Sequence, residues 1–121
     1  MGINIGDEIS KMLREYTDDV IQATNESIEE AGKEAAKELK TAGDFKDRTG
    51  KYRRGWAVKP GEKRLGIQSQ VVHNRKHYQL THLLEYGHVN RDGSRTRAFP
   101  HIAPVEAKMG DLIERKLEEK L

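Results

Sequence analysis

The sequence predicts an α+β fold, in which a long N-terminal helix and a C-terminal amphipathic helix flank a central antiparallel β-hairpin and one short helix. Three patterns predict this fold. Apolar or small residues recur every three or four positions from Ile5 to Ala42. Two runs of alternating residues between positions 52 and 74 are separated by a Pro-Gly turn signal. Apolar residues again recur at helical spacing from about Pro104 to the last residue.

The first helix is predicted to end at Ala42-Gly43, because glycine is the usual residue just beyond a helix C-terminus. Its apolar face is well formed up to Val20 and then thins to small residues. We therefore expect its second half to pack closely against another helix, with a bend at Asn25 or Gly32.

The central hairpin is predicted from a strand over residues 52–59, a turn at 60–63 and a second strand over 64–74. A two-stranded hairpin is only marginally stable alone. We therefore expect it to lie on the helices or to join strands of another subunit.

The last third begins with a short helix, Tyr78–Tyr86, which Gly87 ends. Residues 88–97 are polar, basic and centred on an Asp-Gly turn, which indicates an exposed loop that becomes ordered on assembly. Residues 98–102 are expected to form a short strand or an extended entry to the last helix.

Length and composition indicate one domain with a thin core. The chain has 121 residues, of which 35% are hydrophobic and 35% charged. We expect one domain over 1–121, divided into a helix (1–43), a basic hairpin (44–76) and a C-terminal part (77–121). A thin core is marginal alone, which favours burial against copies of the chain or a partner.

Several classes of protein are excluded on composition. The absence of cysteine excludes disulfides, thiolate metal sites and thiol nucleophiles. The first residues contain no basic segment followed by an apolar run, so we expect no secretory signal and synthesis in a cytoplasm. Charges interrupt every apolar stretch, so no membrane contact is expected.

Charge is segregated along the chain. Residues 1–45 carry 5 basic and 11 acidic residues, residues 46–97 carry 13 and 4, and residues 98–121 carry 4 and 5. The acidic and basic segments are expected to attract each other within one chain or between subunits. Contact of the basic segment with DNA phosphates is the alternative.

Five histidines are the only residues that suggest a metal or a catalytic site: His73, His77, His82, His88 and His101. His73 and His77 have the spacing of helical zinc ligands, but the rest of such a site is missing. His73-Asn74 in a basic region also resembles part of an HNH-type metal-dependent nuclease, without its ligands at defined spacing. No nucleotide-binding loop, nucleophile elbow or carboxylate pair is present. We expect no catalytic residue, no metal and no cofactor.

A basic aromatic cluster, Tyr52, Arg53, Arg54 and Trp56, is typical of nucleic-acid or protein interfaces. The alternative for Trp56 is a place in the core. A basic nucleic-acid-binding module therefore remains a second hypothesis for the whole chain.

Three segments in a fixed order resemble a known family. They are Arg48–Trp56 (RTGKYRRGW), His82–His88 (HLLEYGH) and Arg97–Pro104 (RAFPHIAP), followed by a terminal amphipathic helix. Together they resemble the minor structural proteins of long-tailed phages that are described as tail component, neck, head-tail joining or tail completion proteins.

The resemblance implies a non-enzymatic virion protein that is made in the host cytoplasm and acts where the head meets the tail. It implies assembly into a ring of copies of the chain, contact with other neck and tail proteins, and non-specific contact with DNA in the channel. Residues 88–97 would be the adaptable contact and the residues on either side its framework. The residues expected to form interfaces are Arg53, Arg54, Trp56, Glu85, Tyr86, Gly87, His88, Arg91, Arg95, Arg97, Phe99, Pro100 and His101.

Overall fold

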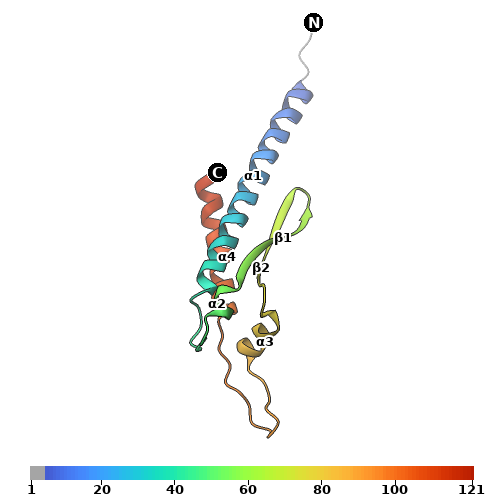
Figure 1. Ribbon diagram of the computed structural model, residues 1–121. Coiled ribbons are helices and arrows are strands. Elements are labelled where there is room, and N and C mark those ends of the chain that lie inside the picture. The colour runs from blue at the N-terminus through green and yellow to red at the C-terminus, as the bar shows by residue number, and fades with distance from the viewer. Residues whose placement is uncertain (1–4) are drawn as a thin grey trace.

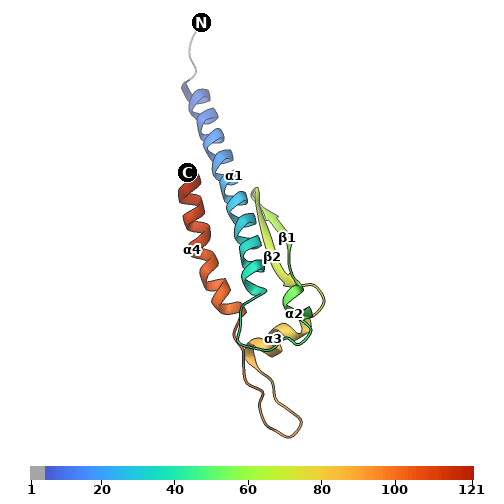
Figure 2. The ribbon, with the colours of Figure 1, turned by 60° about the vertical axis from the view of Figure 1, so that its left-hand side comes forward.

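The computed structural model describes residues 5–121 and confirms the α+β architecture. Its elements are α1 (Ile5–Leu39), α2 (Lys51–Arg54), β1 (Trp56–Arg64), β2 (Ile67–Asn74), α3 (Tyr78–Tyr86) and α4 (Ile102–Lys120). Figure 1 shows an elongated molecule in which α4 runs back along the second half of α1, antiparallel to it. The hairpin lies on another side of α1, and the loop between α3 and α4 extends from the end opposite the N-terminus (Figures 1 and 2).

Helix α1 is continuous through both positions at which a bend was expected, and both positions face the hairpin instead. The Asn25 side chain accepts a hydrogen bond from the Gln68 N–H at 2.9 Å and donates one to the Gly66 carbonyl at 3.0 Å. A Cβ at Gly32 would lie 3.4 Å from Val58, which is an ordinary contact distance, so Gly32 lies directly against the hairpin. Asn25 therefore fixes the hairpin by hydrogen bonds, Gly32 packs against it, and neither residue bends the helix.

The predicted hairpin is present, but its turn was placed wrongly. The strands pair antiparallel from Trp56 opposite Asn74 to Arg64 opposite Ile67. The turn is Leu65-Gly66, with φ of 51° and 84°, and positive φ at both central residues is typical of a tight two-residue hairpin turn. The segment 60–63 instead carries an irregularity in the pairing. Its carbonyls are satisfied from β2, where Gln68 and Ser69 donate to Gly61 and Glu62.

The strand predicted to start at Tyr52 is also wrong at its beginning. Residues 51–54 form the short helix α2, and the strand starts only at Trp56. The Asp47 carboxylate accepts a hydrogen bond from the Arg53 N–H at 2.9 Å and so supports this helical turn. The turn brings Tyr52 to the interior together with Trp56. The centroids of the two rings lie 5.8 Å apart in an edge-to-face arrangement.

The core is small, as the composition indicates. Its buried cluster consists of Ala35, Leu39, Tyr52, Trp56 and Val105. Helix α1 supplies mostly alanines to its buried face, so α4 and β2 approach its backbone from two sides (Figure 2). The attraction that holds these layers together is therefore spread over many small contacts.

Helix α3 has the predicted bounds, and Gly87 follows it with φ of 73°. A Cβ at Gly87 would lie 2.3 Å from the Thr96 carbonyl oxygen, so only glycine fits where the returning chain crosses. Residues 98–101 form no regular secondary structure, and the Phe99 N–H donates to the Leu84 carbonyl. Helix α4 begins at Ile102, two residues earlier than predicted, with Pro104 in its first turn. No helix within residues 5–121 has both the length and the apolar character of a membrane span.

Candidate assembly interface

The sequence-predicted interface residues divide into an interior group and an exposed group. Trp56, Glu85, Gly87 and His101 are buried, and Arg53 and Phe99 are half-buried. The exposed residues are Arg54, Tyr86, His88, Arg91, Arg95, Arg97 and Pro100. The interior group builds the base from which the loop 88–97 extends, so only the exposed group offers surface to a partner.

Glu85 is the centre of that base. Its Oε1 accepts hydrogen bonds from the N–H groups of His101 and Ile102, both at 2.8 Å, and its Oε2 accepts one from Ala103 at 3.1 Å. These N–H groups lie at the start of α4 and have no partner within that helix. Burial raises the pKa of the Glu85 carboxyl, but the three N–H donors and His101 outweigh it, and the net pKa lies below its usual value. A carboxylate at the end of α3 thus caps α4.

His101 joins this cap to the core. Its Nδ1 lies 2.8 Å from the Phe99 carbonyl and 3.0 Å from Glu85 Oε1, and both of these groups are acceptors. The geometry therefore assigns a proton to Nδ1, and in the neutral ring Nε2 accepts a hydrogen bond from the Tyr52 hydroxyl at 2.7 Å. Burial, with the Glu85 charge, raises the pKa of Tyr52 to about 12, so the phenol keeps its proton at neutral pH.

The Arg53 guanidinium makes its contacts within the chain and stabilises the fold. Its guanidinium donates to the carbonyls of Ala42, Gly43 and Phe45 at 2.7, 3.1 and 3.0 Å, and it lies over the Phe45 ring. These bonds hold the connection that follows α1. Trp56 is 5% exposed, and its Nε1 has no hydrogen-bond partner within residues 5–121.

The loop 88–97 is a closed turn with its arginines on the outside. The Thr96 N–H donates to the His88 carbonyl and the Asn90 N–H to the Ser94 carbonyl, each at 2.8 Å. Arg95 donates to the Tyr86 carbonyl at 3.1 Å. The loop extends away from the helices (Figure 1), so its side chains are available to a partner.

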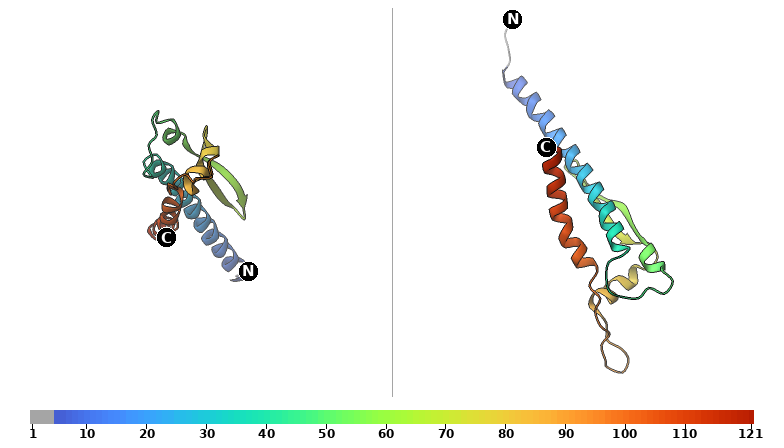
Figure 3. Two further views of the ribbon diagram at one scale, coloured as in Figure 1. Left: turned by 90° about the horizontal axis from the view of Figure 1, so that it is seen from below. Right: turned by 90° about the vertical axis from the view of Figure 1, so that its left-hand side faces the viewer.

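A second exposed surface lies at the opposite end of the molecule. Residues 6–19 of α1 are all exposed, and we name this segment the α1 arm. Figure 3 shows it projecting beyond the C-terminus of α4. Four large apolar side chains along it are 52–67% exposed: Ile9, Met12, Leu13 and Tyr16. The apolar face predicted up to Val20 includes these four side chains, but the sequence does not reveal that α4 ends at Lys120 and leaves them largely exposed.

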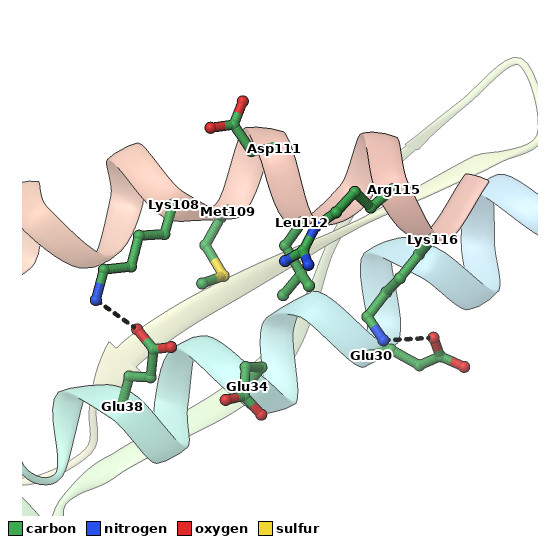
Figure 4. A pocket seen from close by; sticks show the side chains of 9 residues that line it. All are labelled: Glu30, Glu34, Glu38, Lys108, Met109, Asp111, Leu112, Arg115 and Lys116. Atoms are coloured by element: carbon green, nitrogen blue, oxygen red, sulfur yellow. Dashed lines mark ion pairs between the residues drawn. The ribbon is translucent and has the colours of Figure 1, made fainter. Parts of the chain in front are cut away.

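The acidic part of α1 pairs with α4 and not with the basic middle of the chain. The Lys116 Nζ lies 3.1 Å from Glu30, and the Lys108 Nζ lies 3.8 Å from Glu38, across the groove of about 500 Å³ in Figure 4. Hydrogen bonds from Lys116 and Lys120 lower the pKa of Glu30. The charges of this groove are therefore largely compensated by each other, whereas most Lys and Arg side chains of residues 46–97 form no ion pair within residues 5–121.

The histidines do not gather into a metal site. His73 lies in β2 and His77 precedes α3, so their spacing is not that of two ligands on one helix. Within residues 5–121 no three His, Asp or Glu side chains lie close enough to hold a metal ion.

Comparison with known proteins identifies a family. The profile of the family described as "Bacteriophage HK97-gp10, putative tail-component" matches residues 7–87, about two thirds of the chain. The match includes α1 from its third residue, the hairpin and α3, and therefore the first of the three segments that carry the resemblance and the second up to Gly87. No curated protein and no solved structure matches the chain.

Proposed function

We propose, because this chain belongs to the HK97-gp10-like family of bacteriophage tail components, that it is a non-enzymatic virion protein that joins or completes the tail at the head-tail interface. Its contacts in this role are protein-protein contacts, made by copies of the chain in a ring and by neighbouring neck or tail proteins. The observation that carries the proposal is the α1 arm, a helix segment with an uncovered apolar stripe.

The stripe is a continuation of a buried surface. Ala23, Ser27 and Ala31 follow it on α1 at spacings of four residues and are all buried. Contiguous exposed apolar surface on a soluble protein is typical of an interaction site. The arm spans about 21 Å at 1.5 Å per residue, which is enough to lie across a neighbouring subunit.

Charge favours a second copy of this chain as the neighbour. Residues 5–20 carry five acidic and two basic side chains, whereas residues 88–97 carry three arginines and one aspartate. Exposed apolar groups also accompany the basic loop, where Tyr86 is 70% and Val89 63% exposed. Opposite charge and apolar surface at opposite ends support a head-to-tail contact, and such a contact closes into a ring when its rotation permits.

The strength of one such contact supports a multi-subunit assembly. Covering four half-exposed apolar side chains contributes roughly 1 kcal/mol each. This total of about 4 kcal/mol is no more than the cost of association of two proteins. A ring, in which every subunit makes two contacts, and a preformed neck surface both overcome that cost by multivalency.

The test uses the parent phage with this gene deleted and complemented from a plasmid. Negative-stain microscopy of the deletion should show full heads beside separate tails, and the wild-type gene should restore joined, infectious particles. Leu13→Asp should fail to restore them, since Leu13 is 61% exposed on the arm. Leu65→Asp is the matched control, because Leu65 is 96% exposed at the hairpin turn, which lies beside Asn25 of α1 and is not part of the arm.

Normal infectious particles from the deletion would refute the joining role. Equal complementation by Leu13→Asp and Leu65→Asp would instead show that the arm makes no essential contact. Far-UV circular dichroism of both variants, expected to equal that of the wild type, separates a lost contact from a lost fold.

A further inference from the structure

A hollow of about 570 Å³ at one end of the hairpin is lined almost entirely by basic side chains. The residues that line it are Lys51, Arg54, Gly55, Arg75, Lys76 and His77, and we name it the basic hollow. They come from two segments, α2 with the residue after it, and the turn between β2 and α3, which lie beside each other in Figure 2.

The two segments are fixed to each other by hydrogen bonds from the buried Asn74 side chain and from the Arg75 backbone. Asn74, 2% exposed, donates from its side chain to the Tyr52 carbonyl at 2.7 Å and accepts from the His77 N–H at 3.0 Å. The Arg75 N–H donates to the Gly55 carbonyl at 2.8 Å. A Cβ at Gly55 would lie 2.5 Å from the Asn74 Oδ1, so glycine permits this approach. The arrangement of the cations is therefore set by the fold.

The four Lys and Arg charges of the hollow are not compensated by any acidic side chain within residues 5–121. No Asp or Glu lines the hollow, and the ion pairs found within residues 5–121 lie elsewhere. The Arg54 guanidinium donates a hydrogen bond to the Thr49 carbonyl at 3.0 Å, which orients the side chain but does not neutralise its charge. Gathering like charges destabilises the free protein, and an anion bound between them removes that repulsion.

The types of residue that line the basic hollow also indicate which class of anion it binds. Cores of protein interfaces are depleted of charged residues and enriched in large apolar ones, and no large apolar side chain lines this hollow. Proteins that bind single strands stack the bases on aromatic rings, and no Trp, Tyr or Phe of the described residues lines it. Lysines with arginines, whose guanidinium matches two phosphate oxygens, are typical of contact with a nucleic-acid backbone.

We infer that the basic hollow binds the phosphate backbone of duplex DNA without reading its sequence. This site is distinct from the Tyr52, Arg53, Arg54 and Trp56 cluster suggested by the sequence, of which Arg54 alone lines the hollow. The inference goes beyond the proposed joining role, and it does not depend on the α1 arm.

The test is fluorescence anisotropy of a labelled 20-base-pair duplex titrated with the full chain at 50–200 mM NaCl. Four phosphate contacts predict a slope of log K against log [NaCl] of about −3.6. Arg75→Glu with Lys76→Glu should weaken binding at least tenfold and reduce the slope by about two. Lys63→Glu with Arg64→Glu, exposed at the hairpin turn, makes the same change of net charge and should weaken binding less than threefold.

The paired glutamines Arg75→Gln and Lys76→Gln give a milder version, expected to be intermediate, should the charge reversal disturb folding. Equal weakening by the reversals at 63/64 and 75/76 would overturn the site, as would absence of wild-type binding at 50 mM NaCl. Polyglutamate of equal charge should compete much less well than unlabelled duplex. Equal competition would reassign the hollow to an acidic protein and overturn the inference.

Discussion

Replacement of Glu85 by alanine should destabilise the protein by about 3–4 kcal/mol. The carboxylate accepts three N–H groups at the start of α4, and alanine leaves all three without their partner. A buried donor without a partner costs about 1–3 kcal/mol, depending on its access to water. His101 is buried, Ile102 half-buried and Ala103 exposed, so we assign about 2, 1 and 0.5 kcal/mol to their N–H groups.

Glu85→Gln should lower the unfolding free energy by about half as much as Glu85→Ala. Both of the 2.8 Å hydrogen bonds end on one oxygen, Oε1, which the glutamine carbonyl replaces. The bond from Ala103 ends on Oε2, where glutamine presents a donor to another donor. The loss of charge-assisted bonding and of one partner predicts about 1–2 kcal/mol for Glu85→Gln.

Thermal unfolding followed by circular dichroism at pH 7 measures both effects. For a domain of this size, 1 kcal/mol corresponds to roughly 3–5 °C in Tm, so Glu85→Ala should melt roughly 10–15 °C below the wild type. Glu114→Ala, which removes an exposed carboxylate from α4, is the control and should change Tm by less than about 3 °C. A Tm of Glu85→Ala equal to that of the Glu114→Ala control would refute the capping role.

The same carboxylate predicts a pH dependence. Because the folded pKa of Glu85 lies below its usual value, its contribution to stability is complete above that usual value. The contribution is lost as the pH falls through the folded pKa, when the carboxyl takes up a proton. The difference in unfolding free energy between wild type and Glu85→Gln should therefore shrink on acidification below about pH 4.5. A difference that stays constant from pH 7 to pH 3 would contradict the assignment.

Three further predictions concern the core and the loop. The pKa of Tyr52 is raised to about 12, so the phenol ionises first in the unfolded chain and the wild type should lose about 2 kcal/mol of stability between pH 10 and pH 12. Tyr52→Phe should not show this loss, and an equal loss in both proteins, measured by urea denaturation, would argue against it. Trp56→Ala should cost roughly 3–5 kcal/mol in chemical denaturation because the side chain is 5% exposed, and an unchanged midpoint would contradict its core role. Deletion of residues 89–96 should leave the circular dichroism spectrum of the monomer intact and abolish complementation of the deletion phage; an unfolded product would show that the loop is part of the fold.

Hydrophobic periodicity predicted the helices because their buried faces repeat regularly. Helix α3 has the predicted bounds, and α1 ends close to its glycine stop. The hairpin turn was misplaced because Pro60-Gly61 is a strong local turn signal, whereas Leu65-Gly66 is not. The pairing of the two strands, which depends on contacts far apart in the sequence, decides between them. The helix over 51–54 was missed since four residues cannot establish a helical period.

The polar residues of the site were harder to place. Glu85 and His101 were expected both in the framework around the loop and at an interface, and an isolated sequence gives a carboxylate or an imidazole no sign of burial. Their burial depends on mutual partners 16 residues apart, which satisfy each other only once α3 and α4 meet. The basic hollow likewise combines positions 51–55 with 75–77, which no local pattern connects.

The second half of helix α1 packs against the hairpin and α4, whereas the arm is exposed. The two parts of the helix therefore differ in local stability. An isolated helix as short as the arm is marginal in water, because starting a helix is costly. The packed half supplies the first turns, so the arm opens from its free end without unfolding the body. Amide protons of the arm should exchange with solvent much faster than those of residues 23–39 in the free chain. The proposed docking should rigidify the arm, so that slowed exchange confined to residues 6–19 is the signature of assembly expected in solution.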